Sequence, residues 1–267
     1  MMVNRFTTLS KGENMKRFIL SSAAALTATS VALGAQQPQV SAPVGGGIDA
    51  LSLSKFSFSE NINFYNLNTG NVTEFLQKVD YKFSEKFDLN LTLPVYTDGN
   101  TGAGMLTLGA QYELLTTPVS FIDSVDLGLD LMFPTASAGF GGDGVNPVLK
   151  ADVDGKTPIE KLTYSTGASW EWNTDGDYLP IFGGFITKDV LNVDTSLNYE
   201  VIKDLSVAAN YNFWYLDNGS RLNTIGPGLN WAMCDNASFD FACDIPFAED
   251  NASNLDLVVR FGLNVKF

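Results

Sequence analysis

Histidine is absent from this sequence of 267 residues, and cysteine occurs only twice. Histidine is the side chain whose unperturbed pKa suits proton transfer near neutral pH, so its absence removes the commonest general acid or base of hydrolytic enzymes. Cys234 and Cys243 are too few for a disulfide scaffold and have no His to join them in a zinc site. We therefore expect no enzymatic activity, no cofactor and no metal ion, and we expect the two cysteines not to be bonded to each other.

Basic residues are also scarce, since 16 Lys and Arg stand against 30 Asp and Glu and give a formal net charge of −14. A chain so acidic has no basic patch for phosphate groups, which argues against nucleic acid as a partner. Long apolar runs are missing as well. After residue 35 no segment approaches the about 20 apolar residues that a membrane-spanning helix needs.

The N-terminal region has the pattern of a secretory signal peptide. Lys16 and Arg17 precede the mostly apolar run FILSSAAALTATSVALGA, which ends in small residues at Ala35. The alternative, a membrane-spanning helix, is disfavoured because Ser and Thr dilute a short apolar stretch. We assign residues 1–35 to the signal peptide, and we assign residues 36–49, rich in Pro, Gly and Ser, to a flexible periplasmic lead.

Translation is expected to start at Met15, because residues 11–14 can be encoded by a purine-rich string that resembles a bacterial ribosome-binding site. With cleavage after Gly34 or Ala35, the mature protein should begin at Ala35 or Gln36. N-terminal sequencing of the purified mature chain tests both steps. A mature chain that retained residues upstream of Met15 would contradict this prediction.

From about residue 50 to the end, apolar and polar residues alternate in one segment after another, as in FDLNLTLPVY at 87–96 and NLDLVVRFGLNVKF at 254–267. A period of two is that of a β-strand, whose side chains point alternately to the two faces of a sheet. About twelve such segments start near Phe56, Thr73, Phe87, Met105, Ser124, Val145, Leu162, Val190, Leu205, Asn223, Ser238 and Leu255. The predicted fold class is all-β, with an antiparallel sheet of about 12 strands over residues 50–267.

Three features favour a transmembrane β-barrel over a secreted soluble β-sandwich. Tight connections, FSEKF and VIKDL, follow even-numbered strands, whereas long Gly, Asn and Asp-rich loops follow odd-numbered ones, as in barrels with both termini in the periplasm. The apolar face carries Glu60 as its main charge, which a bulge or a misplaced first strand would explain. Aromatic residues of that face gather near strand ends, as in membrane girdles. They are Trp170, Trp172, Phe213 and Tyr215 at one rim and Tyr81, Phe83, Tyr112, Tyr199 and Phe267 at the other.

The C-terminal strand carries a resemblance to a known family. Its alternating apolar residues and terminal aromatic, Phe261, Leu263, Val265 and Phe267, resemble the closing strand of Gram-negative outer-membrane β-barrel proteins. The resemblance implies an outer-membrane location in contact with lipid, and recognition of this strand by the barrel assembly machinery. We expect the strand to pair with the first one, so that no edge is left in lipid. FSEKFDLNLTLPVY and DLGLDLMFPT are in turn similar to outer-membrane transporters grouped under the meta-pathway of phenol degradation.

The face opposite the apolar one would line the interior of such a barrel. By parity it holds fourteen acidic residues, Glu74, Asp80, Asp88, Glu113, Asp126, Asp130, Asp152, Asp154, Glu171, Asp194, Glu200, Asp240, Asp244 and Asp256, and five basic ones, Lys78, Lys82, Lys150, Arg260 and Lys266. Hairpin folding places Lys82 opposite Asp88 and Arg260 near Asp240, which neutralises part of the charge. If the interior conducts, the excess of acid predicts a preference for cations.

A barrel of about eight strands has an interior that side chains fill, whereas one of about 16 strands encloses an aqueous channel. The width of a 12-stranded interior lies between these two cases. Small interior residues such as Gly109 and Gly167 would leave room, so we favour a passive, porin-like channel for small solutes. A closed structural barrel that presents its loops to partners is the second hypothesis. An outer-membrane enzyme is third, because the carboxylates are scattered over many strands rather than paired. The sequence leaves open whether residues 175–189 fold inward as a constriction.

Overall fold

The computed structural model describes residues 55–68, 70–115, 119–182, 184–250 and 255–267. The expected signal peptide and periplasmic lead lie outside the described residues, so those assignments stay predictions. The described elements are β1 (Phe56–Leu67), β2 (Gly70–Lys82), β3 (Phe87–Asp98), β4 (Asn100–Ala103), β5 (Leu106–Leu115), β6 (Ile122–Phe133), β7 (Asn146–Lys156), β8 (Leu162–Glu171), β9 (Asp177–Leu179), the 3-10 helix η2 (Pro180–Phe182), β10 (Gly184–Ile186), β11 (Val190–Ile202), β12 (Leu205–Leu216), β13 (Arg221–Cys234), β14 (Ala237–Asp250) and β15 (Leu255–Lys266).

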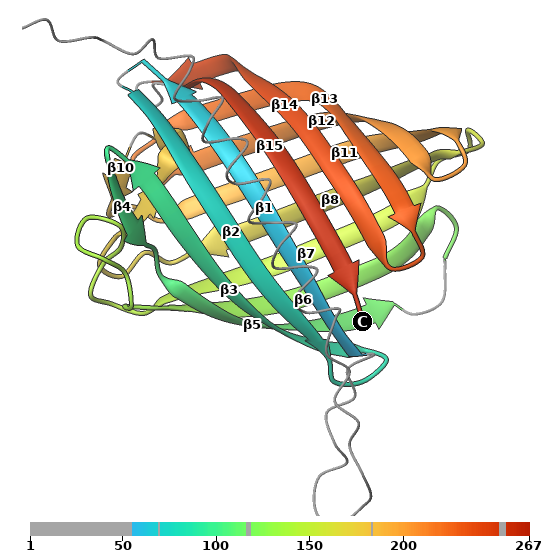
Figure 1. Cartoon of the computed structure of the whole chain (residues 1–267), viewed down its shortest axis with the longest axis horizontal. Helices are drawn as coiled ribbons and strands as arrows, with labels where there is room; N and C mark the ends of the chain where they lie inside the picture. Colours follow the sequence, from blue (N-terminus) through green and yellow to red (C-terminus); the bar gives the residue numbers. More distant parts are fainter. Residues whose placement is uncertain (1–54, 69, 116–118, 183, 251–254) are drawn as a thin grey trace, which may run out of the picture. The chain divides into compact units, whose positions relative to one another are not determined.

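The strands form one antiparallel sheet that closes on itself (Figure 1). Closure follows because β1 pairs with both β2 and the C-terminal strand β15, and β2 in turn pairs with β3. β4 and β5 both pair with β3 and follow one another along it, so together they make one crossing. The barrel therefore has twelve strands, as the alternation predicted. β9 and β10 form a separate hairpin.

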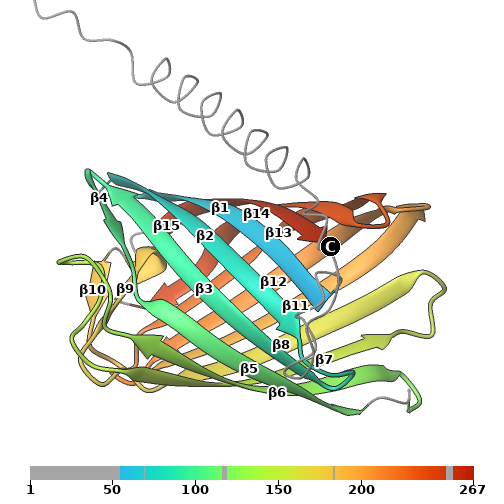
Figure 2. The same ribbon diagram turned by 60° about the horizontal axis from the view of Figure 1, so that its bottom comes forward.

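The two ends of the barrel differ in their connections (Figures 1 and 2). At the end that carries the C-terminus, Lys203 and Asp204 alone join β11 to β12, and Asp204 takes a φ of 68°, which Asp tolerates better than most residues. At the opposite end, long connections span residues 134–145 and 172–189, whereas residues 217–220 form a short one. We call these the terminal end and the loop end.

The outer face is apolar and exposed. Its exposed large side chains include Leu91, Leu108, Leu127, Leu129, Leu149, Leu197, Val207, Ile225 and Ile245. A continuous apolar belt of this kind is what a barrel presents to lipid. Tyr112, Trp172, Tyr199 and Phe267, which the sequence placed in aromatic girdles, are exposed as well. Within the described ranges, no helix is long and apolar enough to cross a membrane.

Polar side chains on the outer face pair with each other across neighbouring strands. The hydroxyl oxygens of Thr166 and Thr195 lie 3.1 Å apart. Glu60 was expected to reflect a bulge or a misplaced strand, but β1 keeps an unbroken register with both neighbours over residues 57–66. The explanation was wrong: Glu60 lies on the outer face and forms a side-chain hydrogen bond with Gln77, directly opposite on β2.

The register of the last strand shifts at its beginning. Between Asn66 and Leu67 a bulge skips one residue of β15, so that Leu67 lies opposite Leu255. Leu255 is 3% exposed and belongs to the interior, whereas Asp256 is exposed. The expectation that Asp256 faces the interior was therefore wrong, because parity cannot anticipate a bulge.

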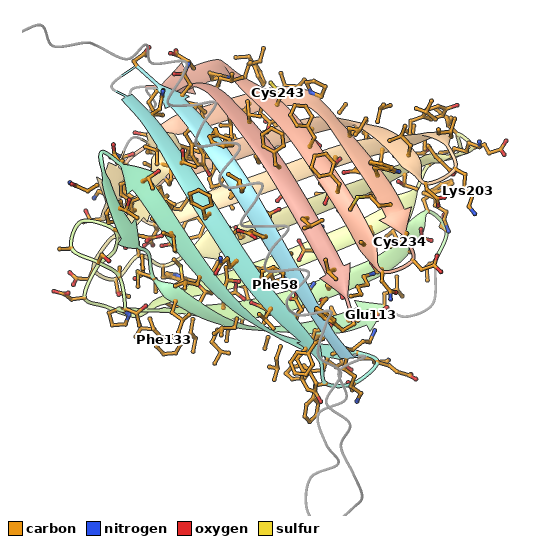
Figure 3. The ribbon with its side chains drawn as sticks, viewed as in Figure 1. Phe58, Glu113, Phe133, Lys203, Cys234 and Cys243 are labelled. Carbon is orange, nitrogen blue, oxygen red and sulfur yellow. The ribbon has the colours of Figure 1, made fainter. Side chains whose placement is uncertain are left out.

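The two cysteines are free, which confirms that they are not bonded to each other. Cys234 is exposed near the terminal end, and Cys243 is half-buried farther along the barrel (Figure 3).

Candidate functional site: the barrel interior

Polar cavities occupy the interior at the terminal end and in the middle of the barrel, in two pairs. A cavity of about 860 Å³ is lined from the β7–β8 turn and from β11 to β14, and it shares Asn230 and Asp240 with one of about 380 Å³. Along β2, β3 and β5, cavities of about 410 and 320 Å³ share Lys78 and Gln111. Much of the interior is thus hollow and polar.

The cavity of about 320 Å³ gathers a dense set of charges. Lys78, Asp130, Lys150, Asp152 and Asp194 line it from β2, β6, β7 and β11. Lys150 forms an ion pair with Asp130, whose side chain is 7% exposed. The alternation along these four strands brings to one cavity residues that are far apart in the sequence.

Interior glycines make room for these charges. A Cβ added to Gly167 would lie 2.8 Å from a carboxylate oxygen of both Asp152 and Asp194. A Cβ at Gly109 would collide with the carboxylate of Asp130. The sequence argument counted such glycines as open space, but neighbouring carboxylates occupy part of it.

Amide side chains line the other side of the interior. Asn230 Nδ2 donates to Oδ1 of Asn198 at 2.7 Å, and Asn264 Nδ2 donates to Oδ2 of Asp240 at 2.8 Å. These groups can hydrogen-bond small polar solutes or water without fixing a charge.

Arg260 is a basic residue that lines the cavity of about 380 Å³. We expected it to lie near Asp240, but it forms an ion pair with Asp244, which is 2% exposed. The physical reason is that Arg260 lies directly opposite Ala242, so both acids are its diagonal neighbours on β14. Asn264 occupies one oxygen of Asp240, and the guanidinium group pairs with the other acid.

The remaining predicted acids divide between the two ends. Toward the terminal end, Asp80 and Asp88 line the cavity of about 410 Å³, and Lys82 lies opposite Asp88 as predicted. Glu113 lies opposite Asp126, so two like charges face each other there.

Toward the loop end, Glu74 and Glu171 are nearly buried. Asn63 Nδ2 and the Tyr65 hydroxyl donate to Oε2 of Glu74 at 2.7 and 2.8 Å. Asn146 Nδ2 donates to Oε1 of Glu171 at 3.2 Å. Apart from Asp256, the predicted interior residues named above follow the interior parity of their strands, but their role in conduction stays a prediction.

At the loop end, apolar side chains fill the interior. We call Asp177–Phe182, which is β9 followed by η2, the plug segment. Its residues Tyr178, Ile181 and Phe182 are 3%, 7% and 9% exposed. They form a buried cluster with Tyr65, Leu67, Val72, Tyr96, Phe140, Val190, Leu216, Leu222, Leu255 and Val258. The cluster members come from β1, β2, β3, β11, β12, β13, β15 and the β6–β7 loop, and the β9–β10 hairpin lies at the loop end (Figure 2).

Aromatic contacts hold the plug segment to the wall. The Tyr178 ring centroid lies 4.8 Å from that of Tyr96 on β3 and 5.0 Å from that of Phe140 in the β6–β7 loop. The Tyr178 hydroxyl donates to Oδ2 of Asp98 at 3.0 Å. Tyr178 therefore joins two separate parts of the loop end.

A hydrogen-bond network centred on Asn146 fixes the base of the same connection. Asn146 is fully buried, and its Nδ2 donates to Oδ1 of Asn173 at 3.2 Å and to the carbonyl of Gly176 at 3.4 Å. The backbone N–H of Thr174 donates to Oδ1 of Asn146 at 2.9 Å. The backbone N–H of Asn173 donates to Oδ1 of Asp189 at 2.9 Å, which ties the two ends of the connection together.

Asp177 is the buried acid of the plug segment, with 4% of its surface exposed. Burial raises the pKa of this carboxyl from 3.8 to about 7; a hydrogen bond from the backbone of Tyr178 opposes the rise, and the nearby Glu74 adds to it. Asp177 also acts on Glu171 as a like charge. The plug segment thus places an ionisable group between two other carboxyls.

The interior side chains can solvate ions and small polar molecules. Among the described residues, no three His, Cys, Asp or Glu side chains form a group that could hold a metal ion. The interior charges form ion pairs and line cavities, and the amides offer hydrogen bonds to water or small solutes.

A closed barrel of twelve strands with an apolar outer belt and a polar hollow defines an outer-membrane β-barrel of the channel type. Its location is the outer membrane of a Gram-negative bacterium. The sequence profile of the family described as "Putative MetA-pathway of phenol degradation" matches residues 38–261, and the chain belongs to this family. The resemblance to the transporters of the meta-pathway of phenol degradation, noted in the sequence, is thereby confirmed.

Solved structures with the same fold are outer-membrane channels and porins. A channel from Pseudomonas putida F1 is 11% identical, with a TM-score of 0.60 over 85% of this chain and 100% of that one. The NanC porin is 11% identical, with a TM-score of 0.57 over 79% and 100% of the two chains, and the KdgM porin is 13% identical, with a TM-score of 0.54 over 79% and 99%. A comparison with curated proteins finds no match.

The residues that fill the loop end were not predicted. The face opposite the lipid was expected to be mostly polar or small, although Tyr65, Leu67, Val72 and Tyr96 lie on it. One signal was available: the apolar run YLPIF at 178–182 inside a long polar loop. An apolar run in a loop needs a surface to cover it, and the loop end supplies that surface.

Proposed function

We propose that the protein is a passive outer-membrane channel for small solutes, with a preference for cations. The observation that carries the proposal is the set of polar cavities in the interior, up to about 860 Å³, which form two pairs that each share lining residues. Family membership and the fold shared with porins support it.

The cation preference follows from the interior charge. Without Asp256, thirteen acidic and five basic side chains remain on this face, an excess of eight negative charges. Low-dielectric walls focus the field of such an excess and concentrate counter-ions. Lys150 and Arg260 each neutralise one acid, so Asp126, Asp152 and Asp194 are better placed to attract mobile cations than Asp130 or Asp244.

Reconstitution of the mature chain in a planar bilayer tests both statements. Unit current steps are expected, and the reversal potential in a salt gradient should show cation selectivity. This selectivity should weaken as salt rises, because the Debye length falls from about 10 Å at 0.1 M to about 3 Å at 1 M. Neutralising Asp126, Asp152 and Asp194 to Asn should reduce it, with the exposed Asp217→Asn as control. An anion-selective wild-type pore would refute the cation preference.

A closed structural barrel is the second candidate, and a specific observation favours it. The buried cluster at the loop end leaves the side chains of the plug segment almost without exposed surface. If that cluster never opens, the protein conducts nothing and acts through its loops. A folded barrel that gives no unit steps under any condition would favour this candidate.

A further inference from the structure

The plug segment lies between two fixed points and is not part of the barrel wall. Asn146 and Asp189 fix residues 173–176 through the network described above. Beyond Gly176, β9 pairs with β10, and an isolated bridge joins Asp177 to Gly141. Within the described residues, neither β9 nor β10 joins the ladders of the barrel wall.

Glycines bound the segment where it leaves its anchors. Gly176 has a φ of 113° and Gly184 a φ of 149°, in a region that L-residues rarely adopt. Such positions can change backbone direction with little steric hindrance. A fixed base, a flexible joint and an apolar tip are the parts of a hinged plug.

Side-chain packing contributes to the attachment of the tip. Tyr178 contacts Tyr96 and Phe140 and donates one hydrogen bond to Asp98. Contacts of this kind can be exchanged for contacts with solute or lipid without breaking the barrel ladders. The polar cavities beneath are lined by other residues, so movement of the tip would leave their walls unchanged.

We infer that the plug segment, Asp177–Phe182, is a hinged gate that closes the loop end and swings away from Tyr96 and Phe140 to open the channel. This inference rests on the proposed channel function. Gating resides in the β8–β11 connection, and the barrel wall stays fixed.

A reversible cross-link tests the gate. In a background of Cys234→Ser and Cys243→Ala, Asp98→Cys and Tyr178→Cys place two thiols across the joint that the hydrogen bond now spans. A short bifunctional methanethiosulfonate should lower the open probability in a planar bilayer about tenfold or more, because tethering raises the effective concentration of the plug. Reduction should restore it. Each single-cysteine variant treated with the reagent is the control.

A variant with weaker packing of the plug segment tests the opposite effect, and we call it the loosened variant. Tyr178→Ser with Phe182→Ser should raise the open probability about tenfold. The exposed Phe121→Ser, at the terminal end, is the matched control and should change nothing. Heat-modifiable gel mobility verifies that each barrel is folded.

The outcomes separate the two proposals. Equal conduction by wild-type and cross-linked protein would overturn the gate and leave the channel standing. Folded wild-type and loosened barrels that both fail to conduct would overturn the channel, and the gate with it. A silent wild type and a conducting loosened variant would support both.

Discussion

A chain that ends at Lys266 is expected to reach the outer membrane at a small fraction of the wild-type level. Phe267 follows the last strand, and its backbone N–H donates to the carbonyl of Phe56 at 3.1 Å, across the β1–β15 closure. Its ring is 45% exposed at the terminal end, where aromatic side chains anchor barrels in the membrane interface. We also propose that the assembly machinery reads Phe261, Leu263, Val265 and Phe267 as its signal.

The measurement is the amount of heat-modifiable barrel in outer-membrane fractions. Phe267→Trp keeps an interfacial aromatic and should assemble close to the wild-type level, whereas Phe267→Asp should behave like the truncation. If the truncated chain accumulated normally, neither the seam hydrogen bond nor the terminal ring would be needed for assembly, and the proposed signal would be abandoned.

The strands were predictable because lipid and water impose a strict period on them. Each residue of a spanning strand faces either hydrocarbon or the interior, so alternation marks the strand and its parity assigns the face. Lys150 and Asp130 were assigned correctly to the interior in this way, and they meet in an ion pair. Predicted strand starts such as Phe87, Leu162 and Val190 coincide with those of β3, β8 and β11.

Events at the strand ends were not predictable by the same argument. A bulge opposite Leu67 reversed the faces of Leu255 and Asp256, and no residue pattern announced it. The ion-pair partner of Arg260 could not be predicted either, since Arg260 can reach both of its diagonal neighbours, Asp240 and Asp244. Register fixes which residues are neighbours, whereas side-chain packing decides which neighbours bond.

The loop end escaped prediction for a further reason. Its interior is apolar because a loop that is distant in the sequence covers it: Tyr178 donates to Asp98 across a separation of 80 residues. A period of two says nothing about a loop that folds back into a barrel. The apolar cluster and the buried acid Asp177 therefore follow from tertiary structure alone.

The open probability of the channel is expected to rise between about pH 4 and pH 7 and then to level off. In the closed state burial holds the pKa of Asp177 at about 7, and an opened plug would return the carboxyl toward its ordinary value of 3.8. The closed state thus binds the proton more tightly. Protonation of Asp177 therefore stabilises the closed state relative to the open state. This stabilisation is complete below the ordinary pKa of the carboxyl and is lost as the pH rises through the pKa of the closed state.

A difference of about three pH units corresponds to about a 1,000-fold change in the ratio of open to closed channels. A neighbouring group works in the same direction, since Glu74 on β2 is a carboxyl whose charge repels an ionised Asp177. Asp177→Asn carries an uncharged side chain of the same shape, so the variant channel should stay closed from pH 4 to pH 7, as the wild type does at low pH.

The control is Asp217→Asn, which changes an exposed acid at the same end and should keep the wild-type pH profile. Single-channel recording separates open probability from unit current, and only the former should follow Asp177. A pH profile that Asp177→Asn left unchanged would assign the titration to other carboxyls and remove Asp177 from the gate.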